Sequence, residues 1–245
     1  MRKIGMSALV VTALAGAAST AHAGMTGGAV TITATANGKT ANWTLPESAV
    51  AWNEDCWSWC TTKPVELRSA DGELLGTIRR MSAGYIADPV VQLTFDIQAG
   101  ASSTNFSVSS ALLSFGNIPS GQARASAAIT LTDFNGNGAT LTGLETGAKA
   151  FLSNYNGFVP GGTAFARLVG NMSATAYAST TSSEQSPAGS GFTAIGSTND
   201  ISTRFNFTLS PTDLASGTSV FVVIPAPSAA ALLGLGSLAG LRRRR

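Results

Sequence analysis

Histidine is almost absent from this chain. The single histidine, His22, lies in an N-terminal segment that we expect to be removed, so the mature protein would contain none. This absence excludes a Ser-His-Asp triad, a Cys-His pair, a histidine general base and any histidine-containing zinc site in the mature protein. Chemistry that uses two carboxylates, as in glycosidases, stays possible.

Charged residues are also scarce, at 11% of the sequence. Six of the fifteen Lys and Arg residues lie in the terminal segments, as Arg2, Lys3 and the four arginines of 242–245. This leaves nine Lys and Arg against thirteen Asp and Glu between positions 24 and 224, a formal charge of about −4. Because phosphate binding requires clustered Lys and Arg, no nucleic-acid partner is expected.

Residues 1–23 have the three parts of a secretory signal peptide. Arg2 and Lys3 form a positive start, residues 4–18 are apolar, and the AHA of residues 21–23 has the small-x-small pattern of a cleavage site. This order predicts export, with signal peptidase cutting before residue 24.

Residues 24–224 predict a single all-β domain. Asn37-Gly38 and Asp71-Gly72 each separate two strand-like runs, as tight hairpin turns require. In "RFNFTL" (204–209) every second residue is apolar, which indicates a strand with one face on a core. We expect a jelly-roll-like β-sandwich of about ten short strands, with polar residues 178–191 as an exposed loop or linker.

The two cysteines, Cys56 and Cys60, lie in the segment "DCWSWC". An even pair in an exported protein predicts a disulfide between them. Such a bond needs the two Cα atoms within about 7 Å, and therefore a turn at Trp57–Trp59. A fully extended strand would hold the two Cα atoms roughly 13 Å apart and would exclude the bond.

All four tryptophans, Trp43, Trp52, Trp57 and Trp59, fall within seventeen residues. We expect them to cover one end of the core, where large aromatic area stabilises packing. The alternative is a sugar-stacking platform, because Trp57 and Trp59 would point the same way in an extended segment.

The segment "DFNGNG" has the spacing of the first half of a calcium loop, with Asp133, Asn135 and Asn137 as candidate ligands. The twelfth position, where such a loop needs Glu, is Leu144, and an Asn- and Gly-rich turn explains the same residues. We therefore expect no metal and no cofactor.

The C-terminal segment, residues 225–245, consists of a proline motif, an apolar run and a basic cluster. These parts are, in order, Pro225, Ala226 and Pro227, then Ser228–Leu241, then Arg242, Arg243, Arg244 and Arg245. As a helix the run would be roughly 21 Å long, against a hydrocarbon core near 30 Å, which suits a transient anchor. The arginines would stop transfer by holding that end in the cytoplasm, as the positive-inside rule requires.

This order resembles the PEP-CTERM sorting signal of exported bacterial proteins, with Ala226 where the family's motif has Glu. The resemblance implies an exosortase-type membrane protease as partner. It also implies display at the cell envelope, at the outer surface or in an extracellular polysaccharide matrix.

These features predict a non-enzymatic structural or adhesive surface protein whose partner could be an exopolysaccharide. The alternatives are a carbohydrate-binding module, or a carbohydrate-active enzyme that uses carboxylates such as Asp96, Asp133 or Glu145.

Overall fold

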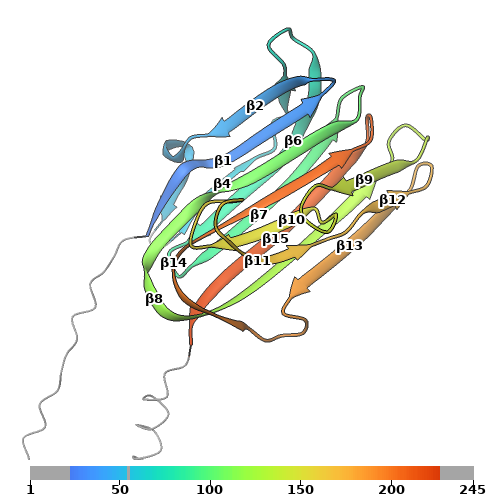
Figure 1. The fold of residues 1–245 in the computed structure, drawn as a ribbon. Coiled ribbons are helices and arrows are strands. Elements are labelled where there is room, and N and C mark those ends of the chain that lie inside the picture. Colours follow the sequence, from blue (N-terminus) through green and yellow to red (C-terminus); the bar gives the residue numbers. More distant parts are fainter. Residues whose placement is uncertain (1–22, 54–55, 227–245) are drawn as a thin grey trace, which may run out of the picture.

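The computed structural model describes residues 23–53 and 56–226. These residues form strands joined by turns, with one short 3-10 helix, η1 (Glu47–Ala49), and no α-helix within the described ranges. The strands, in chain order, are β1 (Gly24–Ala36), β2 (Lys39–Leu45), β3 (Ala51–Asn53), β4 (Cys56–Thr61), β5 (Val65–Arg68), β6 (Leu74–Ile86), β7 (Val90–Ala99), β8 (Thr104–Thr132), β9 (Ala139–Gly143), β10 (Phe151–Tyr155), β11 (Thr163–Leu168), β12 (Met172–Ala174), β13 (Ser179–Ser186), β14 (Thr193–Leu209) and β15 (Leu214–Pro225). All the pairings between these strands are antiparallel. Figure 1 shows how the strands are arranged.

The all-β prediction is confirmed, and so are both hairpins. Asn37 and Gly38 join β1 to β2 with φ angles of 52° and 74°, the positive values that a tight two-residue turn requires. Gly72, between β5 and β6, has a φ of 86°. The expectation of about ten short strands is wrong, because the described residues contain fifteen strands and several of them are long.

Strand β8 accounts for much of this difference. The sequence predicts two strands, over 104–115 and 123–134, but the structure has one strand of 29 residues. Its first half pairs with β1 and β14, and its second half pairs with β13 and β15. Register shifts against β14 between positions 194 and 200 mark bulges, which bend a strand without ending it. The turn-like residues 116–121 therefore form a bend in β8.

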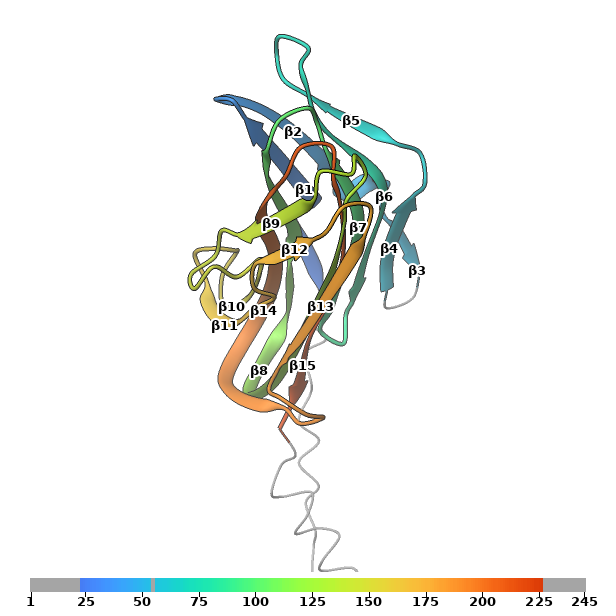
Figure 2. The same cartoon turned by 90° about the vertical axis from the view of Figure 1, so that its right-hand side faces the viewer.

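The bend divides one hydrogen-bonded network into two layers. The first layer contains β2, β1, the first half of β8, β14, β10 and β11, and the second contains β13, the second half of β8, β15, β7, β6, β4 and β3. Figure 2 shows the two layers from the side. Phenylalanines join them: the ring centroid of Phe95 on β7 lies 5.0 Å from that of Phe205 on β14, and Phe165 on β11 lies 5.4 Å from Phe221 on β15.

Tyr85 forms polar contacts between the two layers. Its ring lies on β6 in the second layer and is fully buried. The hydroxyl donates to the carbonyl oxygen of Ala29 on β1 and accepts from the N–H of Ala111 on β8, at 3.0 Å for the latter. Burial raises the pKa of this phenol well above its usual value. The hydroxyl therefore stays protonated and satisfies two backbone groups of the opposite layer.

The segment 178–191 also differs from its prediction. Residues 179–186 are not a loop but strand β13, which pairs with the second half of β8. Hydroxyl pairs accompany this ladder: Thr130 with Thr181, and Thr132 with Ser179, both at 2.8 Å. Polarity alone predicts a loop for such a run of Ser and Thr, but Thr is well suited to a half-exposed strand.

Candidate functional site

The cysteine segment forms strand β4 instead of a turn. Cys56 pairs with Ile86 and Cys60 with Ser82, both on β6. Since residues four apart on a strand are separated by roughly 13 Å, the two sulfur atoms cannot meet, and both cysteines are free thiols. The predicted Cys56–Cys60 disulfide is wrong for this structure, because pairing with β6 holds the segment extended.

The extended conformation of β4 predicts that both cysteine thiols react without reductant. In the folded protein, without reductant, a thiol reagent should modify both Cys56 and Cys60, with exposed Cys60 reacting first and half-buried Cys56 more slowly. Intact-mass measurement should show two added groups. A peptide map containing Cys56 bonded to Cys60 would contradict the pairing of β4 with β6.

Trp57 and Trp59 point the same way, as the extended alternative requires, but they point toward the core. Both are partly buried and pack against the buried cluster, as does Trp43 on β2. The ring centroids of Trp43 and Trp59 lie 5.7 Å apart. The side chain of Trp52 lies outside what the structure describes. The indoles of Trp57 and Trp59 thus cover the edge of the core, which favours the packing interpretation over a sugar-stacking platform.

The predicted calcium residues lie in the loop after β8, where the side-chain oxygen atoms of Asp133 and Asn135 accept internal hydrogen bonds. Asp133 is 3% exposed and accepts from the backbone N–H groups of Gly136 at 3.2 Å and Tyr177 at 2.6 Å. Asn135 accepts from the N–H of Asn137 at 3.1 Å. The turn interpretation therefore accounts for these residues. No group of three or more His, Cys, Asp and Glu suited to a metal occurs in residues 23–53 and 56–226.

A second carboxylate, Asp213, lies beside Asp133 and was not predicted. Asp213 is fully buried; it accepts from Ser210 and from the N–H of Phe134, at 3.2 Å for the latter. Burial and the neighbouring Asp133 raise the pKa of Asp213. Burial also opposes ionisation of Asp133, but the N–H groups of Tyr177 and Gly138 outweigh it and lower the pKa of that carboxyl. As pH rises, Asp133 thus loses its proton before Asp213 does.

The acid pair predicts a pH dependence of stability. Because the pKa of Asp213 is higher in the folded than in the unfolded protein, the folded state holds the proton more tightly. The free energy of unfolding should fall as pH rises above 3.8 through that raised pKa. In Asp213→Asn, whose amide can donate to Asp133, this fall should be absent. Urea unfolding across pH 4–7 measures the free energy of unfolding of the wild type and of Asp213→Asn.

Chelation provides the control for this prediction. We expect the wild-type melting temperature at pH 7 to be unchanged by EDTA. A drop on chelation, restored by calcium and lost in Asp213→Asn, would mean that a cation and not a proton balances the two carboxylates.

The other two candidate acids have structural partners of their own. Asp96 on β7 accepts from Arg80 at 2.6 Å on the outer side of the second layer. Glu145 is 9% exposed and accepts from Arg204 on β14 at 2.8 and 2.5 Å. Asp96, Asp133 and Glu145 are thus used in three separate interactions, and none of them forms a carboxylate pair with another.

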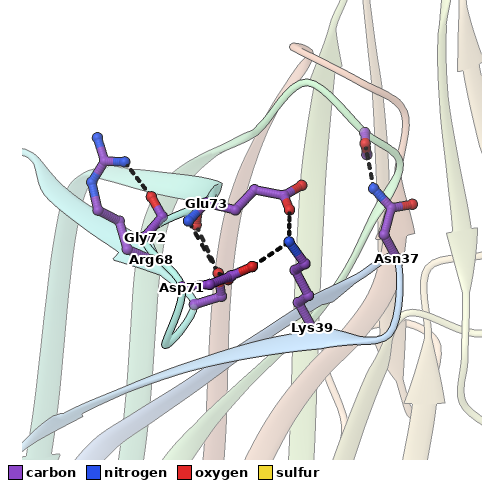
Figure 3. Close-up of polar contacts among 8 residues, drawn as sticks. Asn37, Lys39, Arg68, Asp71, Gly72 and Glu73 are labelled. Carbon is purple, nitrogen blue, oxygen red and sulfur yellow. Dashed lines mark hydrogen bonds and ion pairs between the residues drawn. The ribbon is translucent and has the colours of Figure 1, made fainter.

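A charged cluster joins the turns of the two hairpins. Lys39, after the β1–β2 turn, pairs with Asp71 and, at 2.7 Å, with Glu73, both from the β5–β6 turn (Figure 3). The Lys39 hydrogen bond lowers the pKa of Asp71 to about 2. Beside them, Asn37 donates to Ser102 in the β7–β8 turn at 2.8 Å. These groups are solvent-exposed, so the cluster orders the turns more than it stabilises the fold.

The ends of the described fold lie together at the bend of β8. Gly24, the first residue of β1, pairs with Ser114, and Pro225, the last residue of β15, pairs with Gly121. The N–H of Ala226 donates to the carbonyl oxygen of Ser120 at 2.7 Å. The hairpin turns and the loop after β8 lie at the opposite end of the body (Figure 1).

The remaining residues of the two sorting signals lie outside the described ranges, so the structure does not test their predicted roles. They are positions 1–22 of the expected signal peptide, Pro227, the apolar run Ser228–Leu241, and the basic cluster Arg242, Arg243, Arg244 and Arg245. Within 23–53 and 56–226, no helix is long and apolar enough to cross a membrane.

Comparison with known proteins gives no family. No family model matches the chain, and no curated protein matches it.

Proposed function

We propose that this protein is an exported, non-enzymatic surface protein with a structural or adhesive role in the cell envelope or in an extracellular polysaccharide matrix. Its export would use signal peptidase and its sorting an exosortase-type protease, with residues 225–245 as a transient membrane anchor. The body would be a single jelly-roll-like β-sandwich between these two signals.

One observation carries the proposal: strands begin and end where the two sorting signals meet the body. β1 begins at Gly24, directly after the predicted cleavage site, and β15 ends at Pro225, the first residue of the sorting motif. Both ends lie at the bend of β8, so a tether at Pro225 would place the loops at the far end, away from the membrane. This arrangement supports display of the body on a C-terminal stalk.

The main rival is a carbohydrate-active enzyme with two catalytic carboxylates. Against it, the acids at positions 96, 133 and 145 are engaged with different partners, and Asp133 with its neighbour Asp213 is buried. A catalytic pair must face its substrate across a gap of about 5–10 Å.

Release of reducing ends tests this part of the proposal. The mature protein, purified from its native host, is incubated with neutral and acidic polysaccharides. We expect no release above that of a heat-denatured sample. Sustained turnover that scales with protein concentration would replace the structural role by an enzymatic one.

A further inference from the structure

The outer side of the second layer bears residues aligned across six strands. Its rows follow from the strand register, in the order β4, β6, β7, β15, β8 and β13. Two adjoining rows are formed by the outward residues Ser58, Gly84, Gln92, Val220, Ser126 and Gln185, and by Cys60, Ser82, Thr94, Thr218, Ala128 and Ser183. At about 4.8 Å between strands, each row is about 24 Å long.

Two shallow depressions lie along these rows. One, of about 480 Å³, lies over β13, β8 and β15 and is lined by Ala128, Thr218 and Val220 among others. The second, of about 380 Å³, lies over β4, β6 and β7, with Gly84 and Thr94 in its lining. The hydroxyl groups of Thr94 and Thr218 are 3.3 Å apart where the two depressions adjoin. We call these two depressions together the trough; they follow one another across the strands from β4 to β13.

The two rows of the trough are uncharged. Neither row contains Asp, Glu, Lys or Arg, and the charged residues beside them are already engaged. Arg80 pairs with Asp96, and Glu184, at the edge of the first depression, pairs with Lys149. Arg124 donates to the side-chain oxygen of Gln185 on β13 at 2.7 Å. A polyanion such as a nucleic acid needs clustered cations and finds none in these rows, so the lining fits a neutral partner.

We propose that this trough binds a neutral, linear polysaccharide that lies across the strands. A sugar ring has hydroxyl groups at its rim and C–H groups on its faces. The trough supplies both kinds of contact: Ala128, Gly84 and Val220 give a low, apolar floor, while Ser, Thr and Gln side chains both donate and accept hydrogen bonds. The inference rests on the proposed surface role and names the partner of the body.

The proposal does not require the tryptophans. Trp57 and Trp59 pack against the core, and only Trp59 also borders the second depression. Binding would therefore depend mainly on hydrogen bonds and on the shape of the trough, over a length of several sugar units. Many weak contacts along a chain suit a protein that is displayed in many copies, since multivalent attachment strengthens weak binding.

Affinity electrophoresis tests the trough. The full chain, in mild detergent, is run through native gels that contain dextran, mixed-linkage β-glucan, galactomannan or alginate. We expect at least one of the three neutral polymers to slow the wild type, and alginate not to. Ala128→Leu and Ser82→Leu, one in each depression, should weaken the apparent affinity about tenfold by filling the floor.

Ser107→Leu is the matched control, because Ser107 is an outward residue of β8 in the other layer and is half-buried like Ala128. It should migrate as the wild type does. All variants should keep the wild-type melting temperature within a few degrees, which separates a filled trough from a misfolded body.

Three results would overturn the proposal: no retardation by any neutral polymer, retardation by alginate alone, or retardation that Ala128→Leu and Ser82→Leu leave unchanged. Self-association that Ala128→Leu abolishes would identify a second copy of the chain as the occupant and would also overturn it. None of these results bears on export or tail processing, so failure of the trough and failure of the surface role are distinguishable.

Discussion

Replacing Phe95 by alanine is expected to lower the free energy of unfolding by about 3–5 kcal/mol, the usual cost of removing a buried aromatic ring. Phe95 has no exposed surface, and its ring lies 5.0 Å from that of Phe205 and 6.0 Å from that of Phe207. Since β7 and β14 belong to opposite layers, the cavity would open at the contact between the two layers.

The surroundings of Phe95 explain why little relaxation would follow. Its neighbour on β15 is Gly217, where a Cβ atom would come within 2.3 Å of the Phe95 ring. The ring thus occupies the space that the missing side chain leaves, and Gly217 has no side chain that could fill the cavity.

Urea unfolding of the full chain measures this effect. Thr94→Ala is the control, because Thr94 is the next residue on β7 but points outward, and its loss should cost well under 1 kcal/mol. If Phe95→Ala does not fold, Phe95→Leu should show a smaller loss in the same direction. Equal effects at positions 94 and 95 would contradict the packing of the two layers.

The second large effect is expected at Arg204. Replacing it by alanine would leave the Glu145 carboxylate, whose side chain is 7% exposed, without its charged partner. Removing one member of a buried ion pair costs about 3–5 kcal/mol, because the other charge stays buried and unpaired.

A less buried ion pair provides the comparison for Arg204. Lys149 and Glu184 lie 2.8 Å apart with side chains 30% and 35% exposed, so Lys149→Ala should cost at most about 1 kcal/mol. Replacing Arg204 and Glu145 together by Met and Leu should recover much of the loss. A double variant as unstable as Arg204→Ala would mean that the pair's contribution is packing and not charge.

How far the sequence predicts this fold depends on the range of the interactions involved. The Asn37-Gly38 turn was predictable, because its positive φ angles are a property of two adjacent residues. The bend of β8 was not, since its Gly and Pro residues also suit a turn, and only pairing with β14 keeps the strand continuous. Strand β13 was missed for the same reason: its pairing partner on β8 is about fifty residues away.

The candidate sites divide in the same way. The spacing of Cys56 and Cys60 suggests a bond only if the backbone turns, and the ladder with β6 keeps it extended. Asp133 could be predicted as a candidate because it begins the DFNGNG motif. Its neighbour Asp213 is 80 residues further along the chain and belongs to no recognisable motif. Likewise, the trough is made from alternate residues of six strands, and each of its short side chains is unremarkable within its own strand.

The most direct test of the surface role is mass spectrometry of the exported protein from its native host. We predict a mature N-terminus at Gly24 and no peptide that contains any of Arg242, Arg243, Arg244 and Arg245, with the new C-terminus near Pro225–Pro227. A protein that keeps residues 1–23 and the four C-terminal arginines, and stays inside the cell, would contradict export and sorting together.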